Sequence, residues 1–272
     1  MPYGTEPLQA ATLGDPRVRI AILDGPVDWT HPSLVAANKF NYPGPSWTVS
    51  GRAAAHGTHV ASVILGQQDG GVPGIAPQVS ACSIPIFFDT ENGSCSQIDL
   101  AHAITLAIEQ NVHIINISGG QISAYGEPGL LLTNVIEECA RRNILIIAAA
   151  GNDGCNCLHI PAAVSSVLAV GAMDNAGVPL PESNWGATYK QNGILAPGEN
   201  IVGAVPGGTT VERTGTSFAT AVVTGIASLL VSLQLKATSS YRSPLSLWDA
   251  ADKGVVNVLE SAFTLAIWVK AD

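Results

Sequence analysis

The amino-acid sequence predicts an α/β protein with a doubly wound, mostly parallel β-sheet and helices on both faces. Short apolar runs alternate with helical patterns, as expected of parallel strands joined by crossover helices. The composition agrees, because 47% of the residues are hydrophobic and only 12% are charged. Strands covered on both faces need no alternating polar residues. The 272 residues suffice to bury one large core.

Five apolar runs, each bounded by Gly, Pro or Asn, predict the strands of this sheet. Helical patterns lie between the first four runs. One of them opens with the Ser96 to Asp99 spacing of a capping box, and a further helix is predicted to begin near Thr216. The predicted strands span 18–24, 79–86, 112–118, 144–150 and 167–173, and the helices span 56–65, 96–110 and 129–142.

Residues 1–238 are expected to form a single domain, since no repeat or low-complexity segment divides them. The segment 239–272 is expected to be a C-terminal extension, because Ser239, Ser240 and Pro244 break the preceding helical pattern. A surface extension, part of a neighbouring domain and a chain end are all compatible with its composition.

The charge balance excludes some partners. Twelve Lys and Arg against 21 Asp and Glu give a net charge of -9, and no basic cluster is present for nucleic acid to bind. The N-terminus lacks the regions of a signal peptide, and no apolar run reaches the roughly 18 residues that a membrane helix needs. We therefore expect a cytoplasmic protein without nucleic-acid or membrane partners; the oligomeric state is left open.

Five cysteines allow at most two disulfides. Cys155 and Cys157 are expected to be too close in sequence to bridge each other. A staple from this loop to Cys82, Cys95 or Cys139 and free thiols are both open. A zinc site formed by Cys155 and Cys157 with His159 is disfavoured because a second pair of ligands is missing. No metal and no cofactor are expected.

Asp24, His56 and Ser217 are, in that order, the acid, base and nucleophile that acyl transfer requires. Asp24 closes an apolar strand, where an unpaired carboxylate is costly. His56 is expected at a helix start, projecting toward that strand end, whereas His59 lies one turn deeper and is expected to pack. Ser217 is expected near a helix N-terminus, which favours negative charge. The alternatives are an aspartate capping a turn and an N-cap serine.

Two further segments should reach the same sheet edge. Asn152 follows the fourth predicted strand, so its amide could stabilise an oxyanion; a turn-forming asparagine is the alternative. Gly119 and Gly120, after Ser118, would let a substrate backbone approach and add as a strand; a simple turn is the alternative.

Four motifs in this order resemble those of the subtilisin-like serine peptidases, the subtilases, over about residues 15–235. They are the Asp24 strand, His-Gly-Thr-His-Val-Ala at 56–61, Ala-Gly-Asn at 150–152 and Gly-Thr-Ser-Phe-Ala at 215–219. The resemblance implies a peptidase domain at 1–238. It also implies the following roles: Ser217 as nucleophile, His56 as base, Asp24 as its orienting carboxylate, Asn152 as oxyanion donor, and a substrate pocket between Ser118, Gly119, Gly120 and the Ala150, Gly151 edge.

The chain departs from the usual subtilase pattern near the site. Phe218 replaces the usual Met and is expected to pack beside the active site. The loop after Asn152 is short and carries Cys155 and Cys157, so a remodelled substrate pocket is expected. The loop 66–71 has one carboxylate, too few for a tight calcium site.

The departures resemble the peptidases that mature cyanobactins, on the motifs at 116–121, 151–157 and 184–186. In that group one enzyme removes the leader of a ribosomal precursor peptide and another, with a helical insert between its Asp and His, cyclises the core. Here that spacing is 56 − 24 = 32 residues, without an amphipathic insert. The resemblance therefore implies an endopeptidase that hydrolyses the precursor. The alternatives are a macrocyclase with the same triad and an inactive peptide-binding module.

Overall fold

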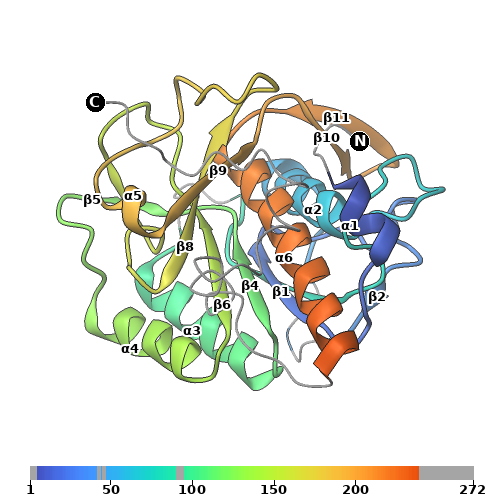
Figure 1. The fold of residues 1–272 in the computed structure, drawn as a ribbon, viewed down its shortest axis with the longest axis horizontal. Helices are drawn as coiled ribbons and strands as arrows, with labels where there is room; N and C mark the ends of the chain where they lie inside the picture. The colour runs from blue at the N-terminus through green and yellow to red at the C-terminus, as the bar shows by residue number, and fades with distance from the viewer. Residues whose placement is uncertain (1–4, 42–43, 45–46, 90–94, 239–272) are drawn as a thin grey trace.

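The computed structural model describes residues 5–41, 44, 47–89 and 95–238. At its centre is a seven-stranded sheet in the order β2-β3-β1-β4-β6-β8-β9, and every pairing in it is parallel. Figure 1 shows it with the helices around it. The strands are β1 (Arg19–Asp24), β2 (Asn38–Lys39), β3 (Ser80–Pro85), β4 (Ile114–Ile117), β6 (Leu145–Ala149), β8 (Val167–Met173) and β9 (Gly193–Pro197).

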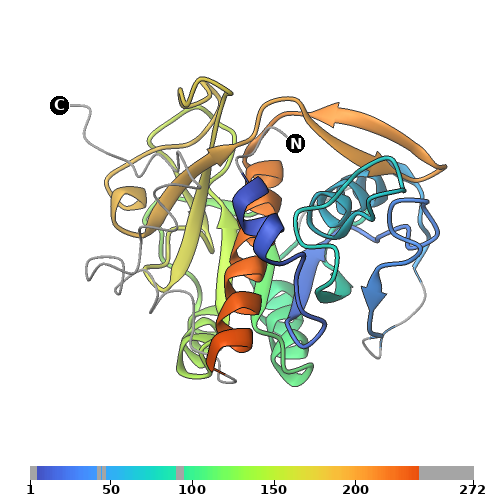
Figure 2. The same cartoon turned by 45° about the vertical axis from the view of Figure 1, so that its right-hand side comes forward.

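The remaining strands form two small antiparallel pairs, β5 with β7 and β10 with β11. The longest helix, α6, runs alongside the sheet in Figures 1 and 2. The strands are β5 (Gln121–Ser123), β7 (Leu158–Ile160), β10 (Ile201–Val205) and β11 (Thr209–Arg213), and the helices are α1 (Glu6–Ala11), α2 (Gly51–Leu65), α3 (Gln97–Glu109), α4 (Leu130–Arg141), α5 (Tyr189–Asn192) and α6 (Thr216–Thr238).

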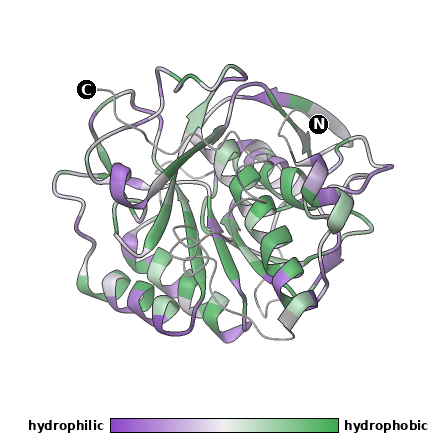
Figure 3. Cartoon of the chain, in the orientation of Figure 1, coloured by the Kyte–Doolittle hydropathy of each residue, from purple (hydrophilic) through white to green (hydrophobic). Residues whose placement is uncertain are grey.

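Helices cover both faces of the sheet, which confirms the predicted fold class. Successive side chains of a strand point to opposite faces, so Ile20 and Ile22 join the core beneath α2 and α6, while Ala21 and Leu23 join the core beneath α3 and α4. The central strands of the sheet are accordingly mostly apolar, as the colouring of Figure 3 shows, whereas the edge strand β2 is polar. The sheet thus has two cores rather than one solvated face.

The predicted strands and helices are present, with one notable correction. The helix predicted at 56–65 begins at Gly51, so His56 lies in its second turn and not at its start. The residues just before His56, Ala53 to Ala55, extend the helical pattern toward the N-terminus. The elements that the sequence did not predict include β2, α5 and β7, which have two to four residues each, too few for a periodic pattern. They also include β9, β10 and β11, with five residues each, and α1, with six.

The prediction that no apolar stretch is long enough to span a membrane was wrong as far as length and composition are concerned. Thr216–Ala237 of α6 is long and apolar enough, with a mean hydropathy of 1.9. However, 83% of it is buried inside the domain, so packing against the sheet accounts for its composition. Three of its buried hydroxyls bond to carbonyls one turn back, those of Thr220, Ser228 and Ser232, so these groups are paired inside the core.

Candidate active site

The predicted site residues meet at the carboxyl edge of the central sheet. Asp24 ends β1, Ser118 follows β4, and Ala150 follows β6. These three strands are neighbours and parallel, with Leu23 opposite Ile117. The residues that follow them therefore leave the sheet side by side, where ligands bind in sheets of this type.

Asp24 and His56 form a hydrogen-bonded pair. His56 Nδ1 lies 2.7 Å from Asp24 Oδ1, which also accepts the backbone N–H of Gly25 at 2.6 Å. The carboxylate is fully buried, whereas the imidazole side chain is 25% exposed. Burial and the charge of Arg213 both lower the pKa of His56. The charge and the hydrogen bond of Asp24 outweigh these two effects, so the pKa of His56 is raised above 6.5. The buried carboxylate therefore stabilises an imidazolium that substrate can still reach.

Two glycines allow this pairing. A methyl group added to Gly57 would lie 2.2 Å from the carbonyl oxygen of Gly25, and one added to Gly25 would lie 1.9 Å from that of Ala53. Helix α2 thus touches the end of β1 backbone to backbone. This close approach brings His56 within hydrogen-bonding distance of Asp24, although His56 is not at the helix start.

His59 lies deeper on the same helix, as the sequence predicted. It is fully buried, and its Nε2 lies 3.0 Å from the carbonyl of Ile201 and 3.2 Å from that of Val211. Burial first, and then the charge of Arg213, lower the pKa of His59 to about 4. A neutral ring that donates to carbonyls anchors the β10–β11 hairpin onto α2.

Ser217 is the second residue of α6, as predicted. Its Oγ donates to the carbonyl of Ser118 at 2.9 Å, and the Oγ of Ser118 donates back to the carbonyl of Ser217, also at 2.9 Å. Asn116, buried in β4, donates to Ser118 Oγ at 2.9 Å and accepts from Thr224 Oγ1 at 2.8 Å. This network holds the start of α6 on the end of β4, with the hydroxyl turned to Ser118 in this resting arrangement.

Phe218 lies beside both helix α2 histidines. Its ring centroid is 5.4 Å from that of His56 and 4.5 Å from that of His59. The expectation that Phe218 packs beside the site is thus confirmed. Since Phe218 directly follows Ser217, this contact also places the imidazole of His56 next to the start of α6.

Asn152 reaches the same helix start from the other side. Its Oδ1 accepts the backbone N–H of Thr216 at 2.8 Å, which identifies that atom as the oxygen, because an N–H requires an acceptor. The remaining NH₂ group stays available on an exposed residue. Asn152 is therefore positioned so that its amide can donate to an atom bound near Ser217.

The two predicted substrate-binding segments also contact parts of the protein itself. A methyl group on Gly119 would lie 2.5 Å from Phe87, and one on Gly120 would lie 2.8 Å from the carbonyl of Ile160. The carbonyls of Ala150 and Gly151 accept hydrogen bonds from Asn184. These glycines thus also make room for protein neighbours, which the sequence reasoning did not anticipate; their contact with substrate stays a prediction.

The prediction that Cys155 and Cys157 do not bridge each other was wrong, whereas free thiols at the other three cysteines were one of the alternatives left open. Cys155 and Cys157 bridge each other, with Cα atoms 5.1 Å apart, while Cys82, Cys95 and Cys139 are buried free thiols. The chain bends at Cys155 and Asn156, which brings the two positions within bridging distance despite the single intervening residue. The disulfide also excludes the zinc alternative for these thiols, and no group of three His, Cys, Asp or Glu side chains suited to a metal occurs in the described part of the chain.

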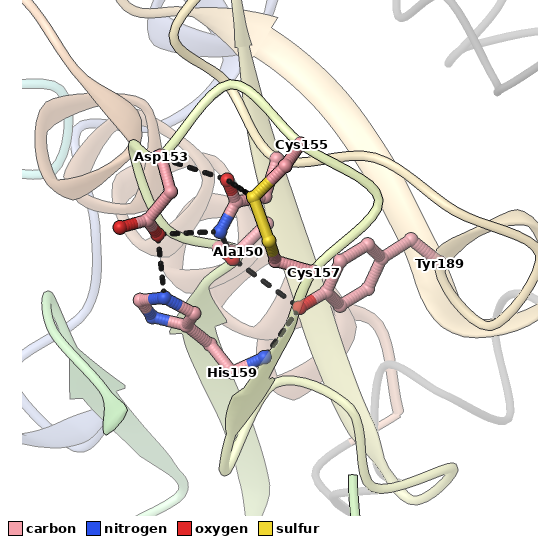
Figure 4. Close-up of a disulfide and its surroundings, with 7 residues drawn as sticks. Ala150, Asp153, Cys155, Cys157, His159 and Tyr189 are labelled. Carbon is pink, nitrogen blue, oxygen red and sulfur yellow. Dashed lines mark hydrogen bonds and ion pairs between the residues drawn. A yellow bond between two sulfur atoms is a disulfide. The ribbon is translucent and has the colours of Figure 1, made fainter. Parts of the chain in front are cut away.

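Residues of this loop surround the disulfide and include a second His–Asp pair, shown in Figure 4. His159 Nε2 lies 2.8 Å from Asp153 Oδ2. The sequence analysis considered His159 only as a zinc ligand and missed this pair. A histidine six residues from an aspartate does not by itself predict a contact between them, because the contact depends on how the intervening loop folds.

Comparisons with known proteins agree with this geometry. Residues 15–260 match the Subtilase family, peptidase S8. The chain is 32% identical over 237 residues to Subtilisin Savinase of Lederbergia lenta (85% of this chain, 84% of that protein) and equally to M-protease of Shouchella clausii (strain KSM-K16), of which it spans 59%.

Solved structures add a narrower likeness. The maturation protease PagA of prenylagaramide matches with a TM-score of 0.83 and 46% identity (91% of this chain, 86% of that one). The patellamide maturation protease PatA matches with 0.80 and 49% (88% and 87%), and the PatG macrocyclase domain with 0.80 and 31% (92% and 86%). The chain therefore belongs to the subtilase family and is a subtilisin-like serine endopeptidase.

Proposed function

We propose that this endopeptidase hydrolyses a ribosomal precursor peptide at a recognition segment and so removes the leader from the core peptide. The Asp24–His56 hydrogen bond beside the start of α6 carries the catalytic part of this proposal. The likeness to PagA and PatA, both maturation proteases, supports the substrate class.

The proposed chemistry assigns one task to each residue. The Ser217 hydroxyl rotates from Ser118 toward His56 and attacks the peptide carbonyl while His56 takes its proton. Asp24 stabilises the imidazolium and holds the ring by Nδ1. The amide of Asn152 and the backbone N–H of Ser217 donate to the oxyanion. His56 then protonates the leaving amine, and water releases the acyl-enzyme.

Hydrolysis is favoured over cyclisation by the segment between Asp24 and α2. Its described residues, 25–41, 44 and 47–50, contain β2 and no helix. A helical insert that shields the acyl-enzyme from water is thus missing from the part of this segment that can be described. Water can then compete for the acyl-enzyme.

Incubation with candidate precursor peptides, followed by mass spectrometry, tests the proposal. Two linear fragments whose summed mass exceeds that of the precursor by one water are expected. A cyclic product would support the macrocyclase alternative instead. Fluorophosphonate labelling of Ser217 separates both from an inactive binding module, which would bind peptide without being labelled.

A Ser217→Ala variant is the control for the nucleophile, and it should abolish both cleavage and labelling. Cleavage by that variant at the wild-type rate would refute the mechanism. The cytoplasmic location and the domain boundary at residue 238 stay predictions, and the extension 239–272 lies outside the described residues.

A further inference from the structure

The ring of His159 lies between the two segments predicted to flank the residue before the cut. A methyl group on Gly151 would come within 2.6 Å of its Cε1, and one on Gly120 within 3.3 Å of its Nδ1. Strand β7 carries His159 there by pairing with β5, where His159 is opposite Ile122. The imidazole therefore occupies the space that separates the Gly119–Gly120 segment from the Ala150–Gly151 segment.

Hydrogen bonds hold both the ring and the backbone of His159 in place. The carboxylate of Asp153, bonded to His159, also accepts from Asn184 Nδ2 at 2.9 Å, and the backbone N–H of Asp153 donates to Asn184 Oδ1 at 2.8 Å. The backbone N–H of His159 donates to Tyr189 Oη at 2.8 Å, which donates on to the carbonyl of Ala150 at 3.2 Å. Figure 4 shows the Asp153 bond to the ring and the Tyr189 bond to the backbone nitrogen of His159.

The ring has little freedom to leave. Its side chain is only 13% exposed, and its partner Asn184 is fully buried. The Cys155–Cys157 disulfide closes the turn between Asp153 and His159, and the backbone N–H of Trp185 is bonded to the carbonyl of Cys155. Moving the imidazole aside would break its hydrogen bond to Asp153 inside a loop that is tied at several points.

We propose that His159, held by Asp153, closes the pocket for the residue before the cut and restricts it to small side chains. This inference rests on the proposed peptidase mechanism and names the residue that sets its specificity. Side chains the size of Gly, Ala or Ser fit in front of the ring. Larger ones such as Phe would have to displace it, at the cost of the Asp153 hydrogen bond and of contacts with both glycines.

Aminoalkyl diphenyl phosphonates carrying an Ala or a Phe side chain test the pocket without any precursor peptide. The hydroxyl oxygen of Ser217 attacks phosphorus and forms a new P–O bond, while the bond from phosphorus to one phenoxy group breaks and phenol leaves with the serine proton. The enzyme gains mass in this reaction, so mass spectrometry over time measures the labelling rate. The wild-type enzyme should react at least tenfold faster with the Ala compound. His159→Gly should lower that ratio at least tenfold by speeding the Phe reaction.

Two matched variants separate size from charge and from misfolding. His159→Phe refills the space without the Asp153 bond and should keep the preference for Ala. His102→Gly removes an exposed histidine of α3 and should leave the ratio unchanged. Unfolded variants are recognised by circular dichroism and by lost fluorophosphonate labelling.

An unchanged ratio in folded His159→Gly, or a wild-type enzyme that accepts Phe as readily as Ala, overturns the inference. A wild-type enzyme that is labelled with the expected preference but leaves precursor peptides uncut refutes only the proposed substrate. The two proposals therefore fail by different observations.

Discussion

Two Asp–His pairs, of similar length, lie near the same sheet edge but have opposite environments. In the Asp24–His56 pair, at 2.7 Å, the carboxylate is fully buried and the imidazole is 25% exposed. In the Asp153–His159 pair, at 2.8 Å, the imidazole is only 13% exposed and the carboxylate is 41% exposed. The side chain that reaches solvent is thus the imidazole in the Asp24–His56 pair and the carboxylate in the Asp153–His159 pair.

This difference in burial determines whether the imidazole or the carboxylate of a pair has its charged form stabilised. The buried carboxylate of Asp24 raises the pKa of His56 against the effect of burial. In the second pair the hydrogen bond from Asn184, followed by that from His159, lowers the pKa of Asp153. The first pair therefore presents a basic imidazole to substrate, while the second holds an imidazole in position. Distance alone would not distinguish a catalytic pair from a positioning pair.

Removing one carboxylate from each pair should give the largest contrast. Asp24→Asn should lower kcat by about 10⁴-fold, the size seen for the triad aspartate of well-studied serine peptidases, subtilisin included. Asp153→Asn, tested on a substrate with a small residue before the cut, should change kcat by less than about threefold, since the 41% exposed carboxylate of Asp153 takes no part in the proposed proton transfer. Steady-state kinetics on one peptide checks both, and equal losses would contradict the contrast.

A third histidine, without a carboxylate, should act on stability. His59 has a pKa of about 4 in the folded state against 6.5 unfolded, so the unfolded state binds the proton first as pH falls. Stability should then be lost between about pH 6.5 and 4, by about 2–3 kcal/mol at pH 4.5. His59→Gln cannot titrate and should lose less over that range. Urea unfolding at pH 7 and 4.5 measures this; identical losses would exclude His59 as the cause.

The Asp24–His56 pair depends on the backbone contact between Gly25 and Gly57. Gly57→Ala should destabilise the domain by about 1–3 kcal/mol and lower kcat, because α2 must move away from the carbonyl of Gly25. Gly129→Ala is the matched control, since its added methyl group would be 3.5 Å from the nearest side-chain atom at an ordinary φ of -63°. Chemical unfolding compares them, and similar values would contradict the argument.

The second pair is the one tied by a disulfide. Replacing Cys155 and Cys157 together by serine should cost about 1–2 kcal/mol, because the bridge closes a very short loop. In a domain of this size that is a fall in Tm of a few degrees. Reductant should lower the Tm of the wild-type protein and leave the double variant unchanged. A reductant effect on the double variant would show another cause.

The smallest effect should be a shift in pH profile. His56 must be neutral to act as a base, and its pKa is raised, so kcat/KM should rise with pH through a midpoint above 6.5. Asp24→Asn should move that midpoint down, because the charge that raised the pKa is gone, whereas Asp153→Asn should leave it in place. Rate profiles between pH 5 and 9 decide, and an unmoved midpoint in Asp24→Asn would argue against the assigned base.

Much of the fold was predictable because buried parallel strands and their helices have strong local signals. Short elements such as β2 and β7 were not, since two or three residues have no period. The early start of α2 was missed because a run of alanines after a glycine carries no sharp boundary. The oxyanion and nucleophile candidates could be placed because Asn152 follows a buried apolar strand and Ser217 lies at the start of a long helix.

What the sequence by itself determined was the order of the strands and helices along the chain and the positions of Asp24, Asn152 and Ser217 at or close to the ends of these elements; His56 was predicted at a helix start but lies in the second turn of α2. Only the tertiary structure decided which groups touch. The Gly25–Gly57 contact, the Cys155–Cys157 bridge and the position of His159 between two glycines depend on backbone separations of a few ångströms, and residue types alone do not specify those distances.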